Sequence, residues 1–211
     1  MAPRARKIGI SRRSWLAAGL ATPLFRLRAD GQPNSLGTIF DGDTIRPVTP
    51  GFHFLTGRPL ERLRYGHTVV FLSKLTLYEE DHVTVFRQSA QRFYVSCDLW
   101  DDEHFRVTIP GANPEAMNGL TASRAEAWCL DNVSISALGM APERPFWLRF
   151  DLRTADPKEL SSVVDDTGIS LRSLIEYFSR RPGPGQPQWG FETHLRLADL
   201  HRTPSRGMRN E

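Results

Sequence analysis

Apolar and polar residues alternate in the middle of the chain, along four consecutive segments with short polar connections. In the first of them Leu75 and Leu77 alternate with Lys74 and Thr76. A period of two predicts strands that each bury one side. The four segments are 66–78, 82–88, 92–99 and 104–109, with charged turns at 79–81 and 101–103. We predict an antiparallel meander, in which one face of the sheet is buried and the other is solvated.

Three further segments continue this pattern. They are 133–138, 145–152 and 189–197. The segment 145–152 shows it most clearly, because every second residue is apolar: Phe146, Leu148, Phe150 and Leu152 alternate with Trp147, Arg149 and Asp151. Each segment is therefore predicted to be a strand.

Helical patterns are fewer. Residues 123–130 are rich in helix formers, with Thr121 or Ser123 as the N-cap and Glu126 at capping-box spacing from Ser123. Residues 170–178 place apolar side chains on one helix face, at Leu171, Leu174, Ile175 and Phe178. A short helical turn is expected over 157–163, and the Pro-Gly-rich segment 182–187 is expected to be a loop.

Seven or more strands with so few helices favour a β-sandwich or an open barrel over a wound α/β sheet. The expected fold is mainly β, an antiparallel β-sandwich with one or two short helices. A single domain over 55–200 is long enough to bury its own core. An extended N-terminal arm at 31–54 is expected to precede this domain, and a flexible tail at 201–211 to follow it.

The first thirty residues differ from the rest. Arg12 and Arg13 precede a short apolar run, Trp15 to Phe25, which is typical of a twin-arginine export signal. The run is only eleven residues long, far short of the roughly 20 that span a bilayer. Residues 1–30 therefore predict export to the periplasm or cell envelope without an integral membrane span. The alternative is a disordered basic tail on a cytoplasmic protein.

This leader also explains the basic composition. The chain has 27 Lys and Arg against 24 Asp and Glu, a net charge of +3 and a pI of about 9.1. Seven of the basic residues and one acidic residue lie in 1–30, which leaves 20 against 23, about −3, for residues 31–211. A nucleic-acid partner for the main domain is therefore not expected.

The order of these features resembles a family of uncharacterised exported bacterial proteins known only as a domain of unknown function. The resemblance covers about residues 55–197. Its features are the segment Leu60 to Gly66 before a long strand, the strand around Phe93-Tyr94-Val95, the helix at 122–130, the strand at 146–152 and a final strand led by Trp189. It implies a secreted or membrane-associated β-rich domain, and it carries over no catalytic residue.

The chain lacks the motifs of serine hydrolases, phosphate-binding loops, dinucleotide-binding folds and zinc peptidases. No catalytic residue and no cofactor are therefore predicted. The turns at 79–82 and 101–104 are expected at the same end of the meander, where five side chains would suit a divalent cation: Asp81, His82, Asp101, Glu103 and His104. Solvated turns that discourage edge-to-edge aggregation are the simpler interpretation.

Two function classes follow. The first is a non-catalytic domain that binds a protein or an envelope component through aromatic residues on the outer side of the sheet, namely Tyr78, Tyr94, Trp100 and Trp147. The second is a metal-dependent hydrolase of unrecognised type that uses the turns at 79–82 and 101–104. A lipid-binding or envelope-surface sandwich is a weaker third idea. Export to an oxidising compartment would also permit a disulfide between Cys97 and Cys129.

Overall fold

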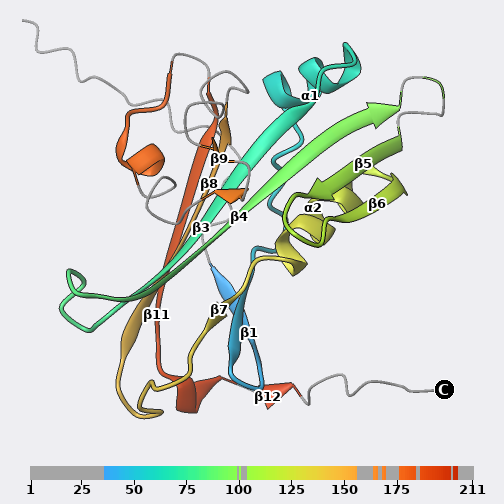
Figure 1. Ribbon diagram of the computed structural model, residues 1–211. Helices are drawn as coiled ribbons and strands as arrows, with labels where there is room; N and C mark the ends of the chain where they lie inside the picture. Colours follow the sequence, from blue (N-terminus) through green and yellow to red (C-terminus); the bar gives the residue numbers. More distant parts are fainter. Residues whose placement is uncertain are drawn as a thin grey trace, which may run out of the picture. The chain divides into compact units, whose positions relative to one another are not determined.

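The computed structural model describes residues 36–98, 100, 104–155, 164–165, 168–169, 176–183, 186–200 and 202–203. All of them belong to one compact unit, residues 31–211, and the expected leader 1–30 is a separate unit. The described unit is mainly β, with two sheets that share a core and a few short helices (Figure 1). The expected β-sandwich class is confirmed.

The helices, in chain order, are α1 (Gly57–Arg64), α2 (Ala122–Asp131) and a 3-10 turn, η1 (Leu197–Asp199). Residues 176–179 are also helical. The strands are β1 (Gly37–Asp41), β2 (Thr44–Val48), β3 (Val69–Tyr78), β4 (Val85–Asp98), β5 (His104–Ile109), β6 (Glu115–Leu120), β7 (Ile135–Ser136), β8 (Phe146–Ala155), β9 (Val164–Asp165), β10 (Gly168–Ile169), β11 (Gln188–Leu195) and β12 (Arg202–Thr203).

The larger sheet has six strands in the order β11-β8-β3-β4-β5-β6, and all neighbours in it are antiparallel. The meander is therefore present. However, the segments 82–88 and 92–99 are not two strands. They belong to one strand, β4, because Ala90 and Gln91 between them pair with Lys74 and Ser73 of β3. This polar stretch needs no turn when a neighbouring strand satisfies its backbone groups.

The smaller sheet has the order β12-β1-β2-β7. Its strands β1 and β2 come from the segment expected to be an extended arm, and that expectation is wrong for the described residues 36–54. Phe40, Ile45, Phe52 and Phe54 are buried in the core. The expected tail also contains a strand, because β12 pairs with Phe40 and its neighbour in β1. Backbone pairing and apolar burial thus make residues 36–54 part of the fold, and backbone pairing adds residues 202–203.

One face of the six-stranded sheet, here called the inner face, carries most of the core. Its side chains pack with the smaller sheet, α1 and α2. Fully buried members of this face are Phe71, Leu75, Leu77, Phe93, Val95, Leu148 and Phe150. Burial of one large apolar side chain contributes roughly 1.5–3 kcal/mol, so this face is the main source of stability.

The expected helix at 123–130 is confirmed as α2, and Thr121 is its N-cap, because its side chain accepts a hydrogen bond from the backbone N–H of Arg124. Glu126 is not part of a capping box. Its buried carboxylate accepts hydrogen bonds from the backbone N–H groups of Phe54 (2.7 Å) and Leu55 (2.6 Å) and contacts His53 Nδ1 (2.7 Å). Glu126 therefore holds the segment before α1 against α2.

Only some of the remaining predicted elements lie within the described residues. The strand expected at 133–138 is reduced to the two residues of β7. The helix expected at 170–178 is described only from residue 176, where the chain is helical. The helical turn at 157–163 lies outside the described residues. Within the described part of the chain, no helix is both long and apolar enough to cross a membrane.

Candidate functional site

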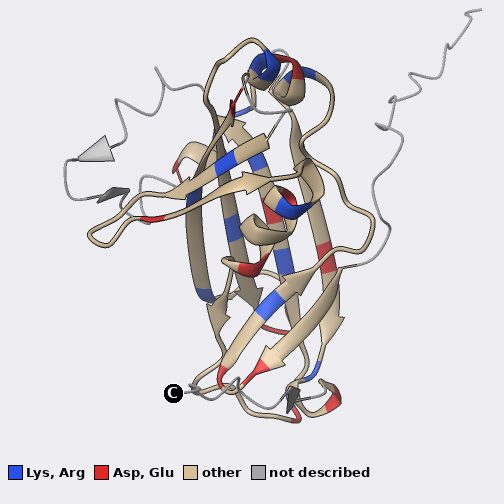
Figure 2. Ribbon diagram, turned by 90° about the vertical axis from the view of Figure 1, so that its right-hand side faces the viewer, with Lys and Arg blue, Asp and Glu red and all other residues tan. Residues whose placement is uncertain are grey.

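The face of the six-stranded sheet opposite the inner face is here called the outer face. Directly paired residues in antiparallel strands point to the same side. The register places four such pairs across β3, β8 and β11: Tyr78 with Trp147, Thr76 with Arg149, Lys74 with Asp151, and Glu192 with Arg149. The part of the outer face occupied by these pairs is thus polar and aromatic, whereas Val70, Leu72 and Ala155 form a small buried apolar cluster with Tyr177 further along the same face. Figure 2 shows that basic residues occur within the strands.

Four rings form a continuous row on this face, here called the aromatic row. Ring centroids lie 5.5 Å apart for Tyr78 and His82, 4.7 Å for His82 and Trp147, and 4.7 Å for Trp147 and His194. Tyr78 and Trp147 are half-buried, whereas both histidines are exposed. The aromatic row therefore offers a rigid surface whose rings partly support one another.

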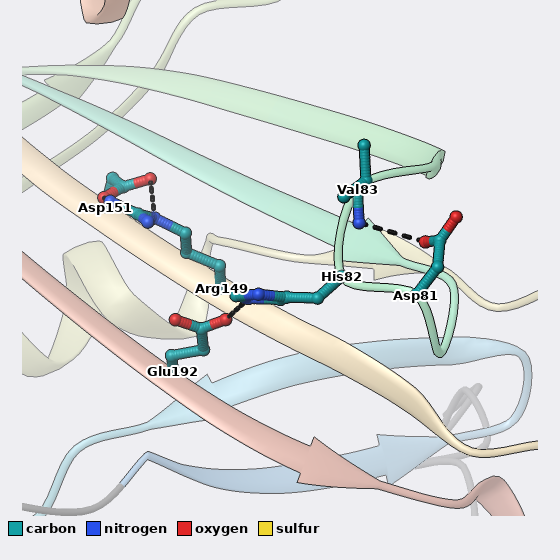
Figure 3. Close-up of polar contacts among 6 residues, drawn as sticks. All are labelled: Asp81, His82, Val83, Arg149, Asp151 and Glu192. Carbon is teal, nitrogen blue, oxygen red and sulfur yellow. Dashed lines mark hydrogen bonds and ion pairs between the residues drawn. The ribbon is translucent and has the colours of Figure 1, made fainter.

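His82 reaches this row from the turn between β3 and β4. Its φ is 58°, a left-handed conformation that few non-glycine residues adopt. The turn is held by Asp81, whose carboxylate accepts hydrogen bonds from the N–H groups of Val83 (3.0 Å) and Thr84 (2.8 Å). The Thr84 hydroxyl, and then these N–H groups, lower the pKa of Asp81. The turn directs His82 back across β8, as Figure 3 shows.

At the end of this reach, His82 Nε2 contacts the carboxylate of Glu192 on β11 (Figure 3). The contact joins the β3–β4 turn to an edge strand 110 residues later in the chain. Glu192 also pairs with Arg149 in the register. The aromatic row is therefore bordered by charged side chains where it reaches β11.

A second ionic group lies in the middle of the outer face. Asp151, only 2% exposed, accepts hydrogen bonds from Nε and Nη2 of Arg149 at 3.0–3.1 Å. Lys74 Nζ lies 3.7 Å from the same carboxylate. The hydrogen bonds to Asp151 raise the pKa of Arg149. Burial lowers the pKa of Lys74, and Asp151 opposes that effect.

Further along the outer face, two arginines flank Leu72 of β3. Arg92 on β4 and Arg153 on β8 both pair with it in the register. The guanidinium carbon of Arg153 lies 3.6 Å from the ring centroid of Tyr177, which covers it from the helical residues 176–179. Arg92 lies 5.1 Å from the Tyr94 ring. Burial lowers the pKa of Arg92.

The residues predicted for a binding face are only partly brought together. Tyr78, Tyr94 and Trp147 lie on the outer face, as the register places them. Trp100 lies elsewhere, in the connection between β4 and β5, where it is 97% exposed beside a cavity of about 640 Å³. Trp100 is therefore not part of the aromatic row.

The arrangement expected for a metal site is not formed by its histidines. His82 and His104 lie at opposite ends of the sheet, because the segments 82–88 and 92–99, expected to be two strands, form the single strand β4 between them. His82 and His104 flank the 14-residue strand β4, which separates them by on the order of 40 Å. Asp81 is engaged in its own turn. Asp101 and Glu103 lie outside the described residues, among which no group of three metal-ligating side chains occurs.

The structure contains Cys97 and Cys129 as thiols and not as the disulfide considered from the sequence. Cys129 is buried on α2, and this burial, together with the nearby Glu126, raises its pKa. Cys97 lies half-buried on β4. A buried thiol with a raised pKa packs as a small apolar side chain.

Sequence reasoning missed most of the charged members of the outer face: Lys74, Arg92, Arg153, Glu192 and His194. One signal was present, since Arg149, Asp151 and Arg153 alternate in a strand whose other side is apolar. Three charges on the polar side of one strand indicate an organised set of ionic side chains.

Arg12 and Arg13 of the expected export signal lie outside the described residues. A scan against protein-family models finds no match for this chain, and no curated protein and no solved structure is significantly similar to it. The resemblance to a family of exported proteins stays a prediction.

Proposed function

We propose that this chain is an exported, non-catalytic binding domain, and that its partner is a protein or another component of the cell envelope. The partner docks on the outer face of the six-stranded sheet, over the aromatic row. The observation that carries the proposal is this row itself, Tyr78, His82, Trp147 and His194, which is partly exposed and flanked by paired charges.

The composition of the outer face supports binding. Aromatic residues and arginine are enriched where proteins bind partners, and the strongest contributions come from a few such residues near the centre of the interface. Trp147 and Arg149 occupy such a position, on a strand with neighbours on both sides. Side chains held on paired strands lose little freedom on binding, which lowers the entropic cost of association.

The pairing of the charged groups supports the same function. Arg149 is engaged by Asp151 and His82 by Glu192, so these groups order one another and present fixed donors and acceptors to a partner. Surface charges arranged in this way contribute specificity and rate of association more than affinity.

Co-sedimentation of the full-length chain with envelope fractions of the source cells tests the binding proposal. The wild type is expected to bind one fraction, and Trp147→Ala is expected to weaken this binding by about tenfold or more. Tyr65→Ala is the matched control, because Tyr65 is also aromatic, is 79% exposed and lies at the end of α1. Equal binding by Trp147→Ala and the wild type would overturn the proposal.

Export is tested separately. The double variant Arg12→Lys, Arg13→Lys is expected to keep the protein in the cytoplasm, whereas the wild type is recovered outside it. Immunoblots of fractionated cells measure both. Wild-type protein found entirely in the cytoplasm at full length would overturn the export part of the proposal and leave the binding part intact.

A further inference from the structure

The buried polar atoms that lack partners gather on one face of the sheet. Five described residues have buried side-chain nitrogen or oxygen atoms without a hydrogen-bond partner, and three of them lie on the outer face: Thr76, Arg92 and Arg153. Buried polar atoms are normally satisfied, and each exception calls for an explanation. Three of the five residues thus lie on the same side of the same sheet.

Arg92 and Arg153 contain most of these unpartnered atoms on the outer face. Nε and Nη1 of Arg92 and Nε of Arg153 have no hydrogen-bond partner, although the two residues are only 9% and 2% exposed. Nη1 of Arg153 donates to the backbone carbonyl of Arg180 at 3.2 Å. Removing a guanidinium from water costs several kcal/mol unless a counter-charge or full hydrogen bonding replaces the water.

Positive side chains outnumber negative ones in this part of the outer face. Lys74, Arg92, Arg149 and Arg153 all lie on the outer face, and Asp151 is the buried carboxylate among them. Its two oxygens are already shared by Arg149 and Lys74. The side of the face around Leu72 therefore carries an excess of positive charge within the described residues.

The geometry allows one anion to meet several of these groups. Arg92 and Arg153 stand on the strands either side of Leu72, so their Cα atoms are about 10 Å apart, a gap that two long side chains can span. Lys74 lies two residues further along the central strand and faces Phe178, 4.9 Å from its ring centroid. The rings of Tyr94, Tyr177 and Phe178 hold the three cationic side chains in place.

We propose that this end of the outer face binds a small oxyanionic group, a phosphate or a carboxylate, between the guanidinium groups of Arg92 and Arg153 and the ammonium group of Lys74. Guanidinium groups match such oxygens with paired N–H donors. The inference rests on the proposed binding function, and it specifies one chemical group of the envelope component that the outer face recognises.

Thermal unfolding of the full-length chain tests this site. Inorganic phosphate and, in a second arm, succinate are compared with sodium chloride at equal ionic strength, and the arm with the larger effect distinguishes phosphate from carboxylate. A ligand that binds only the folded state raises Tm, here by about 2–4 °C or more at a concentration well above Kd. No rise with either anion overturns the proposal.

Variants at Arg92 separate a ligand site from a structural role. Arg92→Met is expected to unfold at the same or a higher temperature without anion, because an unpaired buried charge is removed, and to lose the anion response. Arg92→Lys keeps the charge without the planar donors, and its response is expected to shrink. Arg144→Met is the control, because it removes an exposed charge paired with Glu79 and leaves the anion response unchanged.

One result with this variant would contradict the site: an anion response that Arg92→Met retains, whatever the Tm of the variant without anion. The envelope assay with Trp147→Ala is independent of this readout. Envelope binding without an anion response overturns the oxyanion site alone, and an anion response without envelope binding overturns the proposed function alone.

Discussion

The two faces of the six-stranded sheet are built from the same strands and differ in almost every other respect. On β8 the inner face presents Phe146, Leu148 and Phe150, while the outer face presents Trp147, Arg149 and Asp151. Side chains of both faces are largely buried near the centre of the strand. Burial alone therefore does not distinguish a core from a site. The distinction lies in whether the buried groups satisfy one another.

On the inner face they do. Most of its buried side chains are apolar and contact one another, and aromatic pairs such as Phe150 and Phe191, with ring centroids 6.1 Å apart, extend across neighbouring strands. The buried hydroxyl of Ser73 on this face donates a hydrogen bond to the backbone carbonyl of Gln91. On the outer face Asp151 has two cationic partners, while Nε and Nη1 of Arg92 and Nε of Arg153 have no hydrogen-bond partner among the described residues. The inner face is expected to determine stability and the outer face to determine recognition.

The largest expected effect is on the inner face. Phe150→Ala is expected to lower the free energy of unfolding by about 3–5 kcal/mol, because it leaves a cavity in a fully buried site. Urea denaturation followed by circular dichroism measures it. Trp147→Ala, three residues earlier on the outer face, should cost clearly less. Equal losses in the free energy of unfolding for the two variants would contradict the expectation that the inner face determines stability.

A smaller loss is expected at the centre of the outer face. Asp151→Asn is expected to cost about 3 kcal/mol, since it leaves Arg149 and Lys74 without their shared counter-charge. Asp41→Asn is the control, because Asp41 forms a more exposed pair with Arg46 and should cost less than about 1 kcal/mol. Similar values for the two variants would show that Asp151 has no special role.

The pH dependence of stability sharpens the comparison further. Burial lowers the pKa of Lys74 below its ordinary value of 10.5, so the unfolded chain binds the proton more tightly than the folded chain. The contribution of Lys74 to stability therefore rises as pH increases from its folded pKa toward 10.5. Lys74→Met should remove this rise from melting curves recorded across the alkaline range. An unchanged difference between the two proteins at every pH would contradict the prediction.

The smallest effect is expected at the exposed turn. Hydrogen bonds from Thr84 and Val83 lower the pKa of Asp81, so its contribution is present above the ordinary carboxyl pKa of 3.8 and is lost as pH falls through the lower folded value. Asp81→Ala should thus differ from the wild type in Tm near neutral pH and converge with it in acid. Because Asp81 positions the turn that carries His82, the variant should also weaken envelope binding at neutral pH.

Part of this molecule could be predicted from local pattern. The period-two alternation of β3, β5, β8 and β11 and the composition of α2 identified these elements, since a half-buried strand and a capped helix leave a direct signature in sequence. Local pattern does not predict the strands β1 and β2, because each has only five residues and β2 contains Pro47. Their burial depends on β7 and α2, which lie far away in the chain.

The candidate site divides in the same way. Alternation in β8 by itself determined that Trp147, Arg149 and Asp151 share one side of a strand. Only the tertiary structure decided which residues from other strands and turns join them, because His82, Lys74 and Glu192 meet this group through antiparallel register and a left-handed turn. Register depends on pairing between distant segments, and a shift of one residue would reverse the face of every side chain. The sequence pattern thus determines which residues lie on the same side of one strand. The pairing of distant strands determines which residues of different strands become neighbours.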